Sequence, residues 1–239
     1  MKKLFALTLI FFASSWIFAQ GSYDDLVIIK ADKNWDKLIK TAEKYTLSNS
    51  TKNDPTPYYY LAYGLYKISF IGDRDEKYKN AYKDAYNAIG KMIMLDKSGD
   101  VSAKFENFIE EMKMSLLELT QNELDVKQYP RAFGWGMRFY KFGRSYAPAY
   151  YLDAALRYRR GDRTTANIKW QDGEKLLNQL NVSKLTDADK KILMTGLYES
   201  ADALKDDRQM DGARKMLNLG APYFENNKEW KELYDKIVN

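Results

Sequence analysis

The chain has no cysteine and no histidine among its 239 residues. The lack of cysteine excludes disulfide bonds and thiolate chemistry, and an exported protein of this size can rely on its hydrophobic core instead. The lack of histidine removes the commonest general base and the commonest ligand of transition metals. These two absences exclude serine triads, zincin sites and His-ligated iron, and we expect no cofactor and no metal.

Long apolar runs are absent after the first nineteen residues. Lys2 and Lys3 precede a short apolar run, and small Ala19 suits a cleavage site. The charge-free stretch before Asp24 falls short of the ~20 strongly apolar residues that span a bilayer. We therefore predict a signal peptide over 1–19 and one mature domain over 20–239 that does not span the membrane. The peptide resembles those of bacteria with an outer membrane, which implies the periplasm, and the lack of cysteine excludes a lipoprotein anchor.

Proline is scarce, with five residues, and alternation of period two is not evident. Apolar residues instead recur at helical spacing, which predicts an all-α chain. Gly161-Asp162 is typical of a turn between two helices, and Thr186 with Asp189 predicts a capping box. We expect helices over 23–30, 34–48, 57–71, 76–95, 102–124, 129–142, 147–160, 163–180, 186–204, 208–223 and 228–238.

Two similar runs begin 34 residues apart, at Ala132 and Ala166, which is the length of one helix-turn-helix repeat. The pattern resembles the tetratricopeptide repeat, in which small residues let two antiparallel helices approach and large ones fill the space beside them. The best copy starts at Ala147. Its matching residues are Tyr150, Ala154, Gly161, Asp162, Ala166, Trp170 and Gly173.

Weaker copies include Leu116, Thr120 and Ala132 upstream, and others that begin at Met194 and Pro57. The resemblance covers most of residues 33–223. It implies an all-α, right-handed solenoid of antiparallel helix pairs, TPR-like, with about four to five degenerate repeats. Another α-hairpin array, or a helical bundle with similar packing, remains the alternative.

In this family the ligand usually lies in a concave groove formed by the first helix of each pair. The outward positions of those helices match Tyr151, Tyr158, Arg159 and Tyr198, which predicts an aromatic and locally basic groove. The alternative interpretation is that the tyrosines complete the core between helices.

Charge is distributed unevenly along the chain. Nine cations between Lys127 and Arg163 face only Asp153 and Asp162, a net charge of +7, whereas the whole chain carries +5. Arginine beside aromatic rings suits recognition of carboxylates, although the same pattern also fits a solvated basic face. The partner-binding set predicted in this way combines Arg131, Arg138, Arg157 and Arg160 with Tyr151, Tyr158, Arg159 and Tyr198.

We therefore expect a non-catalytic adaptor of the cell envelope that binds a protein or peptide, acidic or carboxylate-terminated, and no nucleic acid. The oligomeric state is left open. The alternatives are a glycan-binding or cell-wall-binding helical protein, and a lytic transglycosylase. The pair Glu199-Ser200 superficially resembles the catalytic Glu-Ser pair of lytic transglycosylases. Asp207 to Gly212 resembles the start of a calcium loop, but Asn218 stands where a bidentate glutamate is needed.

Overall fold

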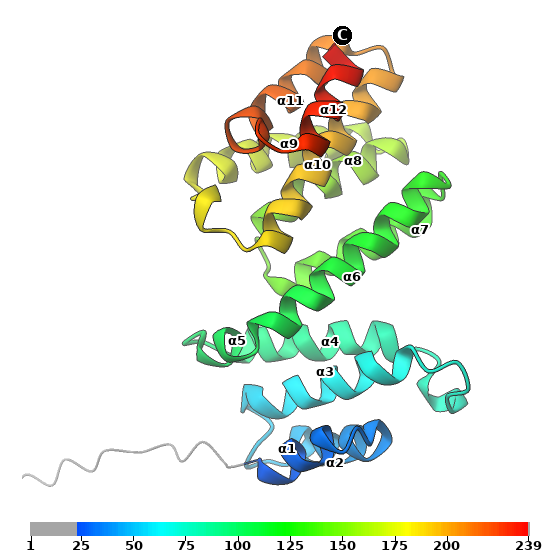
Figure 1. Ribbon diagram of the computed structural model, residues 1–239, viewed down its shortest axis with the longest axis vertical. Helices are drawn as coiled ribbons and strands as arrows, with labels where there is room; N and C mark the ends of the chain where they lie inside the picture. Colours follow the sequence, from blue (N-terminus) through cyan, green and yellow to red (C-terminus); the bar gives the residue numbers. More distant parts are fainter. Residues whose placement is uncertain (1–22, 239) are drawn as a thin grey trace, which may run out of the picture.

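The computed structural model describes residues 23–238, which form α-helices joined by short 3₁₀ turns (Figure 1). No β-strand occurs in this part of the chain. The predicted signal peptide lies outside the described residues. The helices are α1 (Asp24–Ala31), α2 (Trp35–Leu47), α3 (Pro55–Ser69), α4 (Ala81–Leu95), α5 (Asp100–Lys104), α6 (Glu106–Asp125), α7 (Tyr129–Gly136), α8 (Tyr150–Arg159), α9 (Arg163–Gln179), α10 (Asp187–Asp206), α11 (Met210–Phe224) and α12 (Lys228–Val238), with 3₁₀ segments η1 (Glu76–Tyr78), η2 (Met137–Phe142), η3 (Ala147–Ala149) and η4 (Val182–Lys184).

Local sequence explains several helix ends. Asp162 accepts a hydrogen bond from the backbone N–H of Thr165 and so caps α9, while Gly161 before it has a φ of +87°, which glycine adopts without strain. The Thr186 hydroxyl accepts a hydrogen bond from the Asp189 N–H at 3.2 Å and caps α10. The Asp189 carboxylate bonds to Lys113 and Tyr146, so it takes part in tertiary contacts.

Four predicted helices are interrupted. The helix expected over 76–95 is divided into η1 and α4, and the helix expected over 102–124 is divided at Phe105 into α5 and α6. The Phe105 ring stacks on the Tyr59 ring with centroids 3.4 Å apart, so a tertiary contact accompanies this break. The helix expected over 129–142 changes to the 3₁₀ form at Met137, and the helix expected over 147–160 begins with the 3₁₀ turn that contains Pro148.

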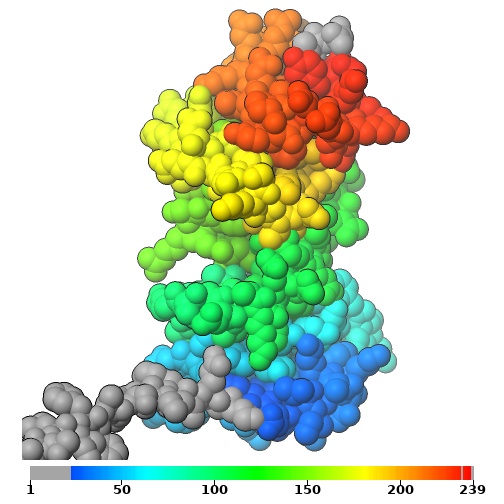
Figure 2. All heavy atoms as spheres, turned by 60° about the vertical axis from the view of Figure 1, so that its left-hand side comes forward, coloured from blue at the N-terminus to red at the C-terminus, as the bar shows by residue number. Residues whose placement is uncertain are grey.

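Helices that are consecutive in the chain pack in pairs, namely α3 with α4, α6 with α7, α8 with α9 and α10 with α11. The layers follow one another along the long axis of the molecule, from α1 and α2 at one end to α11 and α12 at the other (Figures 1 and 2). The residues that support the repeat resemblance in α8 and α9 are buried at these contacts: Ala154, Ala166, Trp170 and Gly173.

The buried side chains form two clusters. The first runs from Tyr23 to Leu156 and includes Ile192, and the second runs from Tyr151 to Ile237. Helices α8 and α10 contribute to both clusters, so they join the two parts of the core.

Candidate functional site

The two tyrosines predicted on α8 are core residues. Tyr151 is 1% exposed, and its ring packs against Gly173 of α9. Tyr158 is 7% exposed; its ring lies 5.3 Å from that of Trp170, and its hydroxyl donates to the Asp207 carboxylate at 2.7 Å. The expectation that both rings face a ligand is therefore wrong. In an isolated helix pair these positions of α8 would face solvent, but here α10 and the helices beside it cover them.

Arg157 and Arg159 form ion pairs within the molecule. The Nε of Arg157 lies 2.7 Å from the carboxylate of Asp153, whose side chain is 1% exposed. Arg159 bridges Asp202, at 2.6 Å, and Asp206, both on α10. The sequence showed only two carboxylates near the basic segment, but folding brings those of α10 to it. The arginines of α8 are thus largely neutralised, and the predicted basic groove does not form there.

The other predicted residues remain accessible. Arg131 and Arg160 are exposed, and Arg138 and Tyr198 are partly exposed. The Arg160 guanidinium lies 4.2 Å from the Phe133 ring centroid and that of Arg138 lies 4.7 Å from Trp135, which is the cation–π geometry expected of arginine stems that cover aromatic rings. Burial, followed by the charge of Asp202, raises the pKa of Tyr198 to about 12.

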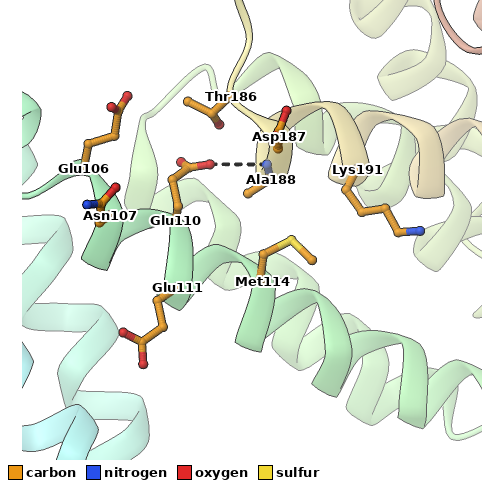
Figure 3. A pocket seen from close by; sticks show the side chains of 9 residues that line it. All are labelled: Glu106, Asn107, Glu110, Glu111, Met114, Thr186, Asp187, Ala188 and Lys191. Atoms are coloured by element: carbon orange, nitrogen blue, oxygen red, sulfur yellow. Dashed lines mark hydrogen bonds between the residues drawn. The ribbon is translucent and has the colours of Figure 1, made fainter.

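A groove lies between α6 and the start of α10, with a volume of about 760 Å³. Figure 3 shows its lining side chains, in which the Glu110 carboxylate accepts a hydrogen bond from the Ala188 N–H at 3.2 Å. Met114 is 42% exposed at this surface. Glu106 makes no ion pair with the described residues. The lining consists of Glu106, Asn107, Glu110, Glu111, Met114, Thr186, Asp187, Ala188 and Lys191.

A second hollow of about 570 Å³, between α3 and α6, shares Glu111 and Met114 with the first. It adds Glu118, which has no ion-pair partner in the described part of the chain, and Phe70, which is 61% exposed. The two hollows are therefore adjacent, and together they follow one face of α6 from α10 to α3. We call this surface the α6 groove; it is acidic and contains exposed apolar side chains.

Sequence reasoning missed the α6 groove, although a signal was present. Helix α6 carries six carboxylates and a single lysine, Lys113. We predicted the binding site on the basic segment because its charges are closer together in the sequence. The α6 groove also needs α3 and α10 beside α6, and a count of charges does not predict which helices pack together.

Lys113 lies beneath this surface and is 7% exposed. Its ammonium group pairs with Asp189 at 2.6 Å and with Glu110 at 2.8 Å. The Tyr146 hydroxyl also donates to Asp189. The cluster fastens α10 to α6 and so fixes both walls of the α6 groove.

Glu199 lies on α10 and is partly buried. Its carboxylate makes no hydrogen bond or ion pair with another described residue. Burial, together with the charge of Asp202, raises the pKa of Glu199 to about 7. Ser200, the second residue of the predicted catalytic pair, makes hydrogen bonds to other residues. Its hydroxyl accepts from Trp170 and lies within hydrogen-bond distance of the Tyr151 carbonyl.

Residues 23–238 contain no cluster of three or more acidic side chains placed to hold a metal ion. In the segment that resembles a calcium loop, the Asp207 carboxylate accepts from Tyr158 and Arg163, so that oxygen is already used. A search for helices in this range that could cross a membrane finds none that is long and apolar enough.

No protein family, curated protein or solved structure matches the chain.

Proposed function

We propose that the protein is a non-catalytic binding scaffold, a TPR-like solenoid that acts in the cell envelope after export. Its ligand is a segment of another protein that carries both basic and apolar side chains. The observation that carries this proposal is the α6 groove, in which exposed Phe70 and Met114 lie beside carboxylates that have no ion-pair partner.

The chemistry of the groove favours a basic segment. Glu106, Met114 and Glu118 follow one another along α6, so the apolar side chain of Met114 lies between two carboxylates without ion-pair partners. Lysine or arginine side chains would neutralise these carboxylates, and methionine adapts readily to apolar groups of different shapes. Helices that are already fixed by the Lys113 cluster lose little conformational entropy when a partner docks.

Photo-crosslinking in intact cells of the source organism tests the proposal. A photo-reactive residue replaces Met114 in one variant and Ile168, which is 51% exposed on α9, in a control. We expect one recurrent protein crosslinked at position 114 and absent at position 168. Equal crosslinking at both positions would contradict a specific groove.

A charge reversal then tests the chemistry. Glu106→Lys with Glu118→Lys should abolish the crosslink at position 114 because the groove becomes basic. The control, Glu43→Lys with Glu225→Lys, makes the same change in net charge at exposed sites without ion pairs and should leave the crosslink unchanged. A crosslink that survives the first pair of substitutions would show that the partner does not use these carboxylates.

A second candidate function, cleavage of cell-wall glycan, is favoured by Glu199 alone. A carboxylic acid with a pKa of about 7 holds its proton near neutral pH, as a general acid must. A zymogram with purified wall glycan distinguishes the two functions. A cleared band that disappears in Glu199→Gln would establish the enzyme, whereas an uncleared gel with both proteins supports the scaffold.

A further inference from the structure

A second groove, of about 800 Å³, lies between the end of α4 and the end of η2 together with the residues that follow it. Figure 2 shows a hollow on this side of the molecule, below the light green atoms of the chain around the end of η2. Four cations line it: Lys91 and Lys97 from one wall, and Lys141 and Arg144 from the other. We call this surface the basic groove.

The charged groups of these four side chains have no internal partner, because none of them makes a hydrogen bond or an ion pair with the described residues. Arg157, Arg159 and Arg163 differ in that each of them contacts a carboxylate. Four cations against one carboxylate, Asp96, leave the lining with an excess of positive charge, so an anion bound between the cations would be stabilised.

The carboxylate in the lining, Asp96, is already engaged. It accepts hydrogen bonds from the backbone N–H groups of Ser102, at 2.6 Å, and Gly99, at 3.2 Å. Burial alone would raise the pKa of Asp96, but these hydrogen bonds outweigh it and lower the pKa. Asp96 therefore stays ionised to hold the start of α5 and makes no ion pair with the neighbouring lysines.

Close packing sets the position of one wall. A Cβ atom at Gly90 would lie 3.1 Å from the Cδ and 3.3 Å from the carbonyl oxygen of Lys141. The end of η2 can therefore approach α4 closely because residue 90 is glycine, and this approach places Lys141 in the wall of the groove opposite α4.

We propose that the basic groove binds an extended acidic polypeptide segment that belongs to a second partner. Besides the four cations, the groove presents Ile93 and Met94, the latter 43% exposed, which suit the apolar side chains of a polypeptide. The aromatic residue in the lining, Tyr140, is less suited to stacking on sugars or bases. Its hydroxyl donates to Asp153 at 2.8 Å, and its ring packs edge-on against Tyr150.

The proposal goes beyond a single binding site, because two grooves of opposite charge would let one rigid molecule hold two different partners. It also gives the acidic partner expected from the sequence a different location: the ends of α4 and η2, in place of α8.

The test uses a fluorescein-labelled peptide of alternating glutamate and leucine and follows its fluorescence anisotropy with the full chain. Lys97→Glu with Arg144→Glu should weaken binding by about tenfold or more, since each substitution replaces an attraction with a repulsion. The control, Lys33→Glu with Lys44→Glu, changes the net charge equally at two exposed positions, one in the turn after α1 and one in α2, and should bind like the natural protein. Thermal unfolding followed by circular dichroism verifies that both variants are folded.

Two results would overturn the proposal. Equal weakening in both double variants would show that the peptide responds only to net charge. Displacement of the peptide by inorganic polyphosphate, heparin or single-stranded DNA at much lower concentrations than by unlabelled peptide would assign the groove to a different polyanion. Because the crosslink at position 114 reports on the α6 groove, a failure there is distinguishable from a failure here.

Discussion

Asp153 gives Arg157 a structural role, because the arginine forms an ion pair with this buried carboxylate. The Asp153 side chain is 1% exposed, and three donors surround it: Arg157 Nε at 2.7 Å, Tyr140 Oη at 2.8 Å and Lys169 Nζ at 3.6 Å. A buried carboxylate is tolerated only when such partners offset its lost hydration. Arg157 is therefore part of the structural framework, although it belongs to the most basic stretch of the sequence.

Reversing this charge should unfold the protein more easily. Arg157→Glu removes the nearest cation from Asp153 and adds a second carboxylate, so we expect the free energy of unfolding to fall by about 3 kcal/mol or more. Arg160→Glu, the matched control, changes an exposed side chain whose guanidinium lies over the Phe133 ring, and its effect should stay within about 0.5 kcal/mol. Urea denaturation of both variants measures the difference. Similar losses would mean that Asp153 does not depend on Arg157.

The misplaced tyrosines show a limit of sequence reasoning for single residues. Tyr151 and Tyr158 are seven residues apart and so share one face of α8, which the sequence establishes. Whether that face meets solvent or another helix depends on α10, which packs on α8 from about forty residues away. The alternative interpretation, in which these rings complete the core, is confirmed by their burial.

At the scale of the elements, glycine controls how closely the helices approach. Gly196 of α10 faces the backbone of α8, and a Cβ atom there would lie 2.5 Å from the Leu152 nitrogen. Backbone atoms cannot move aside as the end of a flexible side chain can. The two helices must therefore separate, or shift along each other, to accept any larger residue.

Two substitutions of glycine by alanine should have opposite effects. Gly196→Ala should destabilise the protein by about 2 kcal/mol, as overpacking of a core does, despite the better helix propensity of alanine. Gly134→Ala in α7 meets no atom within 4 Å and should stabilise by about 0.5 to 1 kcal/mol. Thermal unfolding of the two variants under identical conditions gives both signs. A stabilising Gly196→Ala would show that α8 and α10 are not in such close contact.

Helical periodicity predicted the number and order of the long helices, because each keeps an apolar face of period 3.6. It did not predict the breaks at Phe105 and Met137. Phe105 continues the helical pattern, but its ring stacks on Tyr59, more than forty residues earlier. The walls of the basic groove were also beyond prediction, since Lys97 and Lys141 become neighbours only when α4 packs on η2.

Across the whole molecule, the Lys113 cluster lies where the two buried clusters meet. Lys113 belongs to α6, whose apolar residues pack in the first cluster. Its partner Asp189 lies in the first turn of α10, which contributes Leu193 and Met194 to the second cluster. The same contacts set the distance between the walls of the α6 groove. Stability and the shape of the proposed binding surface therefore depend on one buried cation.

Lys113→Met should weaken this joint without creating a cavity, because methionine has nearly the length of lysine. Asp189 and Glu110, 14% and 22% exposed, would lose their common cation, and we expect the free energy of unfolding to fall by about 3 kcal/mol. Lys175→Met breaks an exposed ion pair with Asp172 and should cost less than about 0.5 kcal/mol. Hydrogen exchange adds a local measurement, since the Ala188 and Asp189 amides should exchange faster only in Lys113→Met as the first turn of α10 opens away from α6. Unchanged exchange at these amides, with a small loss of stability, would show that apolar packing alone holds the two parts of the core together.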